Sequence, residues 1–232
     1  TPRSWCSARR CGASERRQTG PTTLTTSDDL LERIHRFRQT DRWIFSTMLF
    51  SACLSLYASF VLSTDAIRLA ANPKVGLPCN LNEVINCSAV ARSWQAGLFG
   101  FPNAFLGLMA EPVVITIALA SLAGVRFPRG FMLAAQIVYG LGFVFAYWLF
   151  FESTFVIGAL CPWCLLVTVS TTLVFASLTH VNLRDNNLFL PTSLHKTLTK
   201  GLRLGVDNLL VVLWLGAITT LVLAKYGPAL FG

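Results

Sequence analysis

Residues 155–178 read FVIGALCPWCLLVTVSTTLVFASL, an apolar stretch that carries two cysteines three positions apart. It contains no charged side chain, and a helix needs about 20 apolar residues to cross a membrane. The segment from Cys161 to Leu178 rises about 27 Å as a helix, which is roughly one hydrocarbon thickness. The stretch therefore predicts a spanning helix with a Cys-Pro-Trp-Cys motif near one end.

The rest of the chain has the same apolar character. Of its 232 residues, 53% are hydrophobic and only 13% are charged, and the mean hydropathy is +0.57, whereas soluble domains are about 25% charged. We expect an all-α membrane protein, with a compact four-helix transmembrane bundle and a fifth, C-terminal transmembrane helix. The five predicted spanning helices are Trp43–Ser63, Ala104–Val125, Phe131–Phe151, Phe155–Leu178 and Leu209–Leu223.

The positive charges follow the predicted helix ends. The net charge is +8, and nine of the nineteen Lys and Arg residues precede residue 43. A cytoplasmic N-terminus puts fifteen basic residues inside and four outside, as the positive-inside rule requires. This distribution favours a multi-pass protein of the cell membrane, in contact with the lipid bilayer, over a nucleic-acid partner.

Three parts of the chain follow from these patterns. Residues 1–42 form a basic cytoplasmic tail, of which residues 27–41 have the alternation of a surface helix. Residues 43–180 form a four-helix unit with a long outer loop at 64–103. Residues 181–232 supply a cytoplasmic linker and the fifth helix.

Four of the seven cysteines fall on the outer side of this topology. Cys79 and Cys87 lie in the long outer loop, while Cys161 and Cys164 form the CxxC motif. Disulfides persist on an oxidising side of a membrane. A cysteine at a helix N-terminus favours its thiolate, and Pro162 suits a first helical turn. The i, i+3 spacing keeps both sulfurs on one face, where they can exchange with a third sulfur.

Other chemistries for these cysteines are weaker. No histidine lies near them in the predicted topology, so a zinc site requires all four thiolates. A metal site is therefore not expected, and a purely structural bridge between Cys79 and Cys87 is the stronger alternative. Cys53, in the middle of the first helix, is expected to be a small buried apolar residue. Cys6 and Cys11 are assigned no role.

Three motifs in order resemble the vitamin K epoxide reductase family, and in particular its bacterial members. They are CNLNEVINCS at residues 79–88, FGFPNAFLG at 99–107 and CPWC at 161–164. The resemblance implies a four-helix bundle around a quinone, with the outer loop as a cap. It implies that Cys79 exchanges with a partner protein and that Cys87 pairs with Cys161. Cys164 is then the cysteine beside the quinone ring.

The resemblance also implies residues that contact the quinone, either menaquinone or ubiquinone. Asn103 corresponds to the family's asparagine that hydrogen-bonds a quinone carbonyl, and Ser88 falls where the family has a small polar residue. Trp163 is an interfacial anchor that also has the reach to pack on the ring. Thr168 stands where the animal enzymes carry a tyrosine, which weakens an epoxide-reducing function.

The family's frequent thioredoxin-like domain has no counterpart here, so the resemblance implies a separate DsbA-like or thioredoxin-like extracytoplasmic partner. The function predicted is a quinone-dependent thiol–disulfide oxidoreductase that supports disulfide formation. The alternatives are a quinone or vitamin K epoxide reductase and a non-catalytic scaffold stapled by disulfides.

Glu111 is an acid within the second predicted helix. Carboxyl groups inside membranes are costly and often functional. Two interpretations stay open: a proton relay for the quinone, and a protonated side chain that hydrogen-bonds a neighbouring helix.

Overall fold

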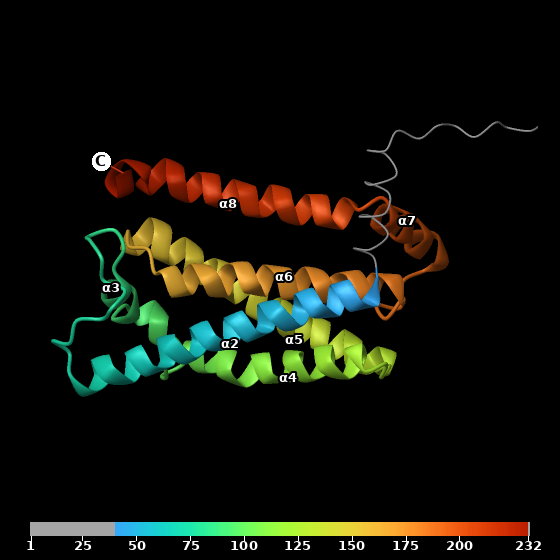
Figure 1. Ribbon diagram of the computed structural model, residues 1–232, viewed down its shortest axis with the longest axis horizontal. Helices are drawn as coiled ribbons and strands as arrows, with labels where there is room; N and C mark the ends of the chain where they lie inside the picture. The colour runs from blue at the N-terminus through green and yellow to red at the C-terminus, as the bar shows by residue number, and fades with distance from the viewer. Residues whose placement is uncertain (1–39, 232) are drawn as a thin grey trace, which may run out of the picture.

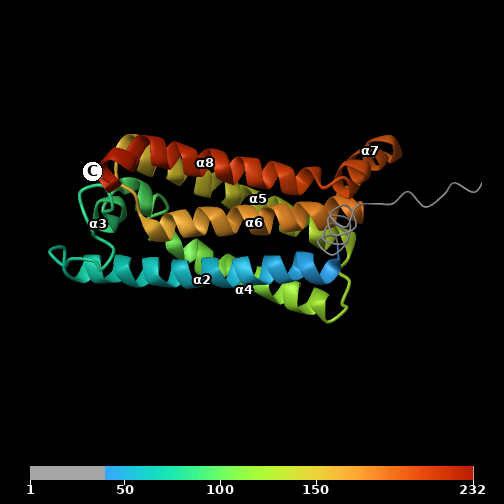
Figure 2. The ribbon, with the colours of Figure 1, turned by 45° about the horizontal axis from the view of Figure 1, so that its top comes forward.

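The computed structural model describes residues 40–231 as a bundle of helices (Figures 1 and 2). Within this range the backbone is helical apart from its connections and one isolated bridge. The elements are α2 (Asp41–Ala71), α3 (Cys87–Ala91), η1 (Trp94–Gly97), α4 (Ala104–Leu122), α5 (Arg129–Phe151), η2 (Glu152–Ile157), α6 (Pro162–Arg184), α7 (Thr192–Arg203) and α8 (Val206–Phe231).

Five of these helices have the length and apolarity to cross a membrane: α2, α4, α5 with its η2 extension, α6 and α8. They run up and down in sequence order, and α2 packs against both α4 and α6 (Figure 1). Hydrocarbon offers no hydrogen-bond partners to the backbone, whereas a helix pairs its own N–H and C=O groups. The predicted all-α fold with a fifth C-terminal spanning helix is confirmed, and the protein is a multi-pass membrane protein.

Several predicted helix ends need correction. α2 continues to Ala71, so the first part of the predicted outer loop at 64–103 is helical. From here on, the remaining part of that loop, residues 72–103, is called the cap. α6 begins at Pro162 rather than Phe155, because the residues before it continue α5 as a π-helical turn. Gly158, with φ of +73°, ends that turn. The fifth helix is longer than predicted, and the linker before it contains α7.

Residues 1–39 lie outside the described part of the chain. The predicted basic tail, nearly all of the predicted surface helix at 27–41, and Cys6 and Cys11 therefore lie outside it as well.

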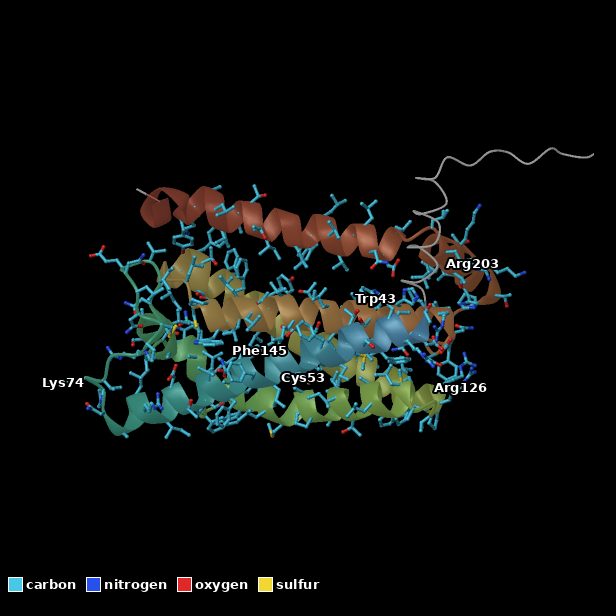
Figure 3. All side chains as sticks on the ribbon, in the orientation of Figure 1. Trp43, Cys53, Lys74, Arg126, Phe145 and Arg203 are labelled. Carbon is cyan, nitrogen blue, oxygen red and sulfur yellow. A yellow bond between two sulfur atoms is a disulfide. The ribbon has the colours of Figure 1, made fainter. Side chains whose placement is uncertain are left out.

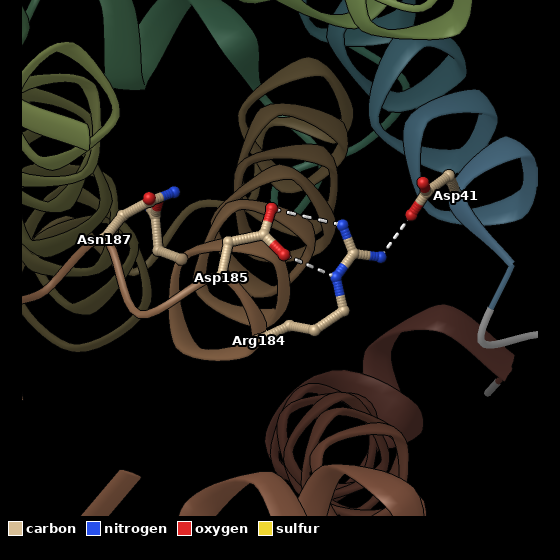
Figure 4. Close-up of polar contacts among 5 residues, drawn as sticks. Asp41, Arg184, Asp185 and Asn187 are labelled. Atoms are coloured by element: carbon tan, nitrogen blue, oxygen red, sulfur yellow. Dashed lines mark hydrogen bonds and ion pairs between the residues drawn. The ribbon is translucent and has the colours of Figure 1, made fainter. Parts of the chain in front are cut away.

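The two ends of the bundle differ. Arg126 and Arg203 lie at one end, together with Trp43, and Lys74 lies at the other (Figure 3). The end with Lys74 also holds the cap, and it is called the cap end here. At the opposite end, Arg184 of α6 forms ion pairs with Asp41 of α2 and with Asp185 (Figure 4).

An apolar core fills the half of the bundle away from the cap. Its most deeply buried members come from α2, α4 and α6: Met48, Ala52, Ile117, Ala118, Val174 and Leu178. Cys53 does not belong to it. The expectation that Cys53 is buried is wrong, because its side of α2 faces outward (Figure 3).

Small residues allow α2 and α4 to approach closely. Ser51, Ser55, Ser59 and Ser63 recur every fourth residue and are all buried. A Cβ placed on Gly107 of α4 would lie 2.1 Å from the Ser59 hydroxyl oxygen. Small residues at such crossings are a common device of membrane helix pairs.

We predict that Gly107→Val destabilises the bundle by about 2 kcal/mol, because the added methyl groups overpack the crossing of α2 and α4. Thermal unfolding in detergent micelles would measure the loss. Gly216→Ala on α8 is the control, since a Cβ there has no neighbour within 4 Å. Equal melting temperatures for Gly107→Val and the wild type would contradict the close packing.

Candidate redox site

The cap carries a disulfide between Cys79 and Cys87, with an S–S distance of 2.08 Å. Cys87 opens α3, and the Asn86 side chain caps that helix by accepting from the Ala89 N–H. Asn80 closes the loop from the other side. Its amide nitrogen donates to the Ser88 hydroxyl (2.7 Å), and its carbonyl oxygen accepts from the Ser88 N–H (3.1 Å).

A short backbone pairing joins the cap to the segment before α6. The Leu160 N–H donates to the Val84 carbonyl (2.7 Å), and the Asn86 N–H donates to the Leu160 carbonyl (3.1 Å), forming a parallel bridge at Ile85. This pairing places Cys87 and Cys161, each the neighbour of a paired residue, in one buried cluster. The four sequence-predicted cysteines therefore meet at the cap end of the bundle, since Cys79 belongs to that cluster and Cys164 packs against it.

Cys161 is the N-cap of α6, and Pro162 follows in the first turn, as expected for a CxxC motif. A hydrogen bond from the Cys164 thiol holds the pKa of Cys161 below its ordinary value, although burial opposes this. The backbone N–H groups of Cys164 and Trp163 act in the same direction as the thiol. Cys161 is therefore the sulfur of the pair that holds negative charge most readily.

A cavity of about 710 Å³ lies beneath the cap, between α2, α4, α5 and α6. Three of the cysteines line it: Cys87, Cys161 and Cys164. Its walls are mostly apolar and aromatic, as is usual for sites that bind small organic molecules. Asn103 and Glu111 also line it, so the structure brings these two predicted residues to the same space as the thiols.

Asn103 reaches the cavity from the start of α4 and is 8% exposed. Its Nδ2 donates to the Gln95 carbonyl at 2.6 Å, which leaves one N–H free. Its Oδ1 is buried and has no hydrogen-bond partner within the protein. The side chain is thus held in place while a donor and an acceptor stay available for a bound molecule.

Glu111 lies two turns further along α4 and is only 3% exposed. Its Oε1 accepts hydrogen bonds from Ser55 of α2 (2.7 Å) and Tyr139 of α5 (3.1 Å). Its Oε2 is buried with no partner. Sequence reasoning missed Ser55 and Tyr139, because nothing in a serine repeat or in a single tyrosine points to a carboxyl group on another helix.

Two of the predicted quinone contacts do not reach the cavity. Ser88 is turned toward Asn80, and its hydroxyl helps to close the disulfide loop. Trp163 packs edge-on against Tyr57 of α2, with ring centroids 5.7 Å apart. Neither residue is part of the cavity lining.

The fifth helix also supports the site. Thr154, fully buried in the π turn that precedes the CxxC motif, accepts hydrogen bonds at its carbonyl from the Lys225 ammonium and the Tyr226 hydroxyl. Nearer the start of α8, the Trp214 indole N–H donates to the Tyr147 hydroxyl of α5 at 2.8 Å. α8 thus anchors the turn that leads into Cys161.

Comparison with protein families settles the relationship of the chain. Residues 46–179, more than half of the sequence, match the profile of the vitamin K epoxide reductase family. The chain belongs to this family. No curated protein matches it. The family assignment makes the protein a membrane oxidoreductase with disulfide-related redox chemistry, and family members generally use a quinone. α7 and α8 lie outside the matched residues.

The residues of this family member fit a quinone. The cavity is large and mostly apolar, a thiol lines it, and two buried polar side chains there have an unpartnered oxygen, on Asn103 and on Glu111. A ring with carbonyl oxygens at its edge would accept a hydrogen bond from the free N–H of Asn103, and from the carboxyl group of Glu111 in its protonated form. Within residues 40–231, no three His, Cys, Asp or Glu residues are grouped to hold a metal ion.

We predict that Asn80→Ala makes the Cys79–Cys87 disulfide easier to reduce. The substitution removes both hydrogen bonds to Ser88, each worth about 1 kcal/mol or less, so reduction by dithiothreitol should be about threefold to tenfold faster. Ser88→Ala is the matched control. This variant keeps the hydrogen bond from the backbone N–H of residue 88 to Asn80 Oδ1, so its rate of reduction should increase less. Equal rates for the wild type and both variants would contradict the role of Asn80.

We also predict that replacing both Lys225 by Met and Tyr226 by Phe loosens the turn before Cys161, because the Thr154 carbonyl loses both donors. Hydrogen exchange of residues 153–161 should become faster, while exchange in the middle of α6 stays unchanged. Thr220→Val on the same helix is the control, since its hydroxyl bonds only within α8. No difference between the double variant and this control would show that α8 does not hold the turn.

Proposed function

We propose that this family member oxidises the thiols of an extracytoplasmic DsbA-like or thioredoxin-like protein and passes the two electrons to a membrane quinone. The observation that carries the proposal is the continuous placement of four cysteines from the cap to the cavity. Cys79 and Cys87 lie in the cap, Cys161 joins them in one buried cluster, and Cys164 packs against that cluster and lines the cavity.

Each proposed exchange conserves one S–S bond. A partner thiolate attacks Cys79, and Cys87 leaves as a thiolate. The second partner thiol then attacks the mixed disulfide, which releases the oxidised partner and a reduced Cys79. Cys87 next attacks Cys161 of an oxidised CxxC pair, and Cys164 leaves as a thiolate. Cys79 then attacks Cys87, which restores the loop disulfide and leaves Cys161 and Cys164 reduced.

The last transfer takes place in the cavity. Cys161 and Cys164 re-form their disulfide and lose two electrons and two protons, and the quinone supplies the oxidising power. The protein contributes alignment and a largely apolar pocket.

The orientation proposed places the N-terminus in the cytoplasm and the cap outside the cell membrane. It is supported by the fifteen basic residues that the topology assigns to the cytoplasmic side, against four on the other. Arg126 and Arg203 lie together at the end opposite the cap (Figure 3). This orientation puts the thiols where disulfides persist.

Two other functions have less support. An epoxide reductase of the animal type would use a tyrosine at the position of Thr168. The Thr168 hydroxyl donates instead to the Cys164 carbonyl of its own helix at 2.9 Å. A stapled scaffold gives no reason for two free thiols to lie against a large apolar cavity.

We predict that both Cys79→Ala and Cys164→Ala abolish quinone reduction in detergent-solubilised protein supplied with a reduced DsbA-like partner. The reason is that each variant removes one sulfur of the relay. Cys164→Ala should also accumulate a disulfide that involves Cys161, which mass spectrometry of alkylated peptides would detect. Loss of absorbance of the quinone measures turnover.

Cys53→Ala is the control, because its thiol lies on the outer face of α2 and takes no part in the relay. It should keep the wild-type rate. Steady-state turnover by Cys164→Ala would disprove the role of that thiol. Absence of quinone reduction by the wild type, with a loop disulfide that never exchanges, would favour the scaffold.

A further inference from the structure

Glu111 carries a hydrogen-bonding group that the cysteine relay does not use. Both neighbouring hydroxyls, of Ser55 and Tyr139, donate to its Oε1. Its Oε2 has no partner within the protein, although the residue is 97% buried and lines the cavity. A buried oxygen without a partner is costly, so an unpaired Oε2 beside a cavity indicates a bound group that completes it.

The surroundings of Glu111 favour its neutral form. Its contacts are hydroxyls rather than cations. Among the described residues that line the cavity, the one cation is the guanidinium of Arg92. It lies in the cap and donates to the Pro73 carbonyl. An isolated carboxylate in such a place is strongly disfavoured. Because Oε1 accepts both hydrogen bonds, Oε2 is the oxygen left to carry the proton of the neutral acid.

Glu111 also marks the floor of the cavity. Beyond it along α4 come Val114 and Ile117, which pack with Met48, Val174 and Leu178 in the apolar core. These side chains are 4% exposed or less. Glu111 itself lines the cavity, which is therefore the way by which its proton exchanges.

The spacing of Asn103 and Glu111 matches one class of ligand. Eight residues of α-helix separate their backbones by about 12 Å along the axis. A para-quinone that accepts a hydrogen bond of about 2.8 Å at each carbonyl oxygen spans about 11 Å between the two donors. The rise between the two residues is thus of the same order as the span of the ring and its two hydrogen bonds, and both side chains line the one cavity.

We infer that Glu111 is a catalytic acid that holds the distal carbonyl oxygen of a para-quinone and donates its proton there during reduction. The inference rests on the proposed function, because it assigns a residue to the same cavity. Asn103 holds the near oxygen, Cys164 faces the ring, and the hydroxyls of Ser55 and Tyr139 stabilise the Glu111 carboxylate once its proton has left.

The transfer balances in atoms and electrons. Formation of the Cys161–Cys164 bond releases two electrons to the ring and frees both thiol protons. Glu111 donates its proton to the distal oxygen. One thiol proton goes to the near oxygen, and the other returns to Glu111. The site thus ends with a disulfide, a quinol and a neutral Glu111.

The test compares Glu111→Gln with Glu111→Leu, using menadione as the probe. Glutamine keeps an N–H that donates to the distal oxygen but supplies no proton, whereas leucine provides neither. Quenching of tryptophan fluorescence measures the binding of menadione. Infrared difference spectroscopy measures the frequencies of the two carbonyl stretches of the bound probe. Reduction is followed in a single turnover of protein whose cysteines have been reduced beforehand and freed of reductant.

We expect Glu111→Gln to bind menadione within about threefold of the wild type, with both carbonyl bands shifted, and to reduce it at least about 100-fold more slowly. We expect Glu111→Leu to bind it about tenfold more weakly, with one carbonyl band returned to its unbound position. Asp185→Asn makes the same carboxyl-to-amide change at the opposite end of the bundle and should match the wild type in every readout. Unchanged reduction of the Cys79–Cys87 disulfide by dithiothreitol shows that each variant is folded.

Wild-type rates in Glu111→Gln would overturn the proton donation. Wild-type affinity and unshifted carbonyl bands in Glu111→Leu would overturn the contact itself. Suppose instead that the wild type binds menadione with two shifted carbonyl bands, that Glu111→Leu returns one band to its unbound position, and that the wild type never reduces the probe. This result would overturn the proposed function and leave the contact of Glu111 supported.

Discussion

The redox site depends on the two backbone hydrogen bonds that join the cap to Leu160. Cys87 and Cys161 lie on segments that more than seventy residues separate, and each follows a residue of this pairing. Backbone groups inside a bilayer must be paired within the protein, so irregular segments that exchange hydrogen bonds are tolerated only at the ends of the bundle or against a cavity. The thiol chemistry is therefore at the cap end, while the helices beneath it supply a rigid support.

The bundle divides along its length into a chemical half and a sealing half. Near the cap, small residues on α2 and α4 and a cluster of polar side chains border the cavity. Toward the other end, Met48, Val174 and Leu178 are buried in one apolar cluster between the helices. A molecule in the cavity thus meets the thiols and the polar groups of α4 but has no open route through the core.

The fifth helix adds a support that the family match does not include. α8 meets the bundle through polar contacts spread along its length: Asp207 with His180, Trp214 with Tyr147, and Lys225 and Tyr226 with Thr154. In hydrocarbon such hydrogen bonds and close packing have to replace the hydrophobic effect as the force between helices. The last of these contacts falls on the turn before Cys161, which connects α8 to the geometry of the CxxC motif.

The sequence by itself determined the five spanning helices and the place of the CxxC motif near the start of one of them, because both are local features. An apolar segment of spanning length, or a proline directly after the first cysteine of a CxxC at a helix start, can be recognised without knowledge of the distant segments that pack against it. Helix ends were less certain: the π turn before Gly158 is as apolar as the helix that follows, so hydropathy alone did not separate them. Only the tertiary structure decided that Cys53 faces outward, that Ser88 turns to Asn80, and that Ser55 and Tyr139 meet Glu111 from other helices. The physical reason is that lipid and protein core are both apolar, so the pattern along a spanning helix leaves its rotation open until the helices pack.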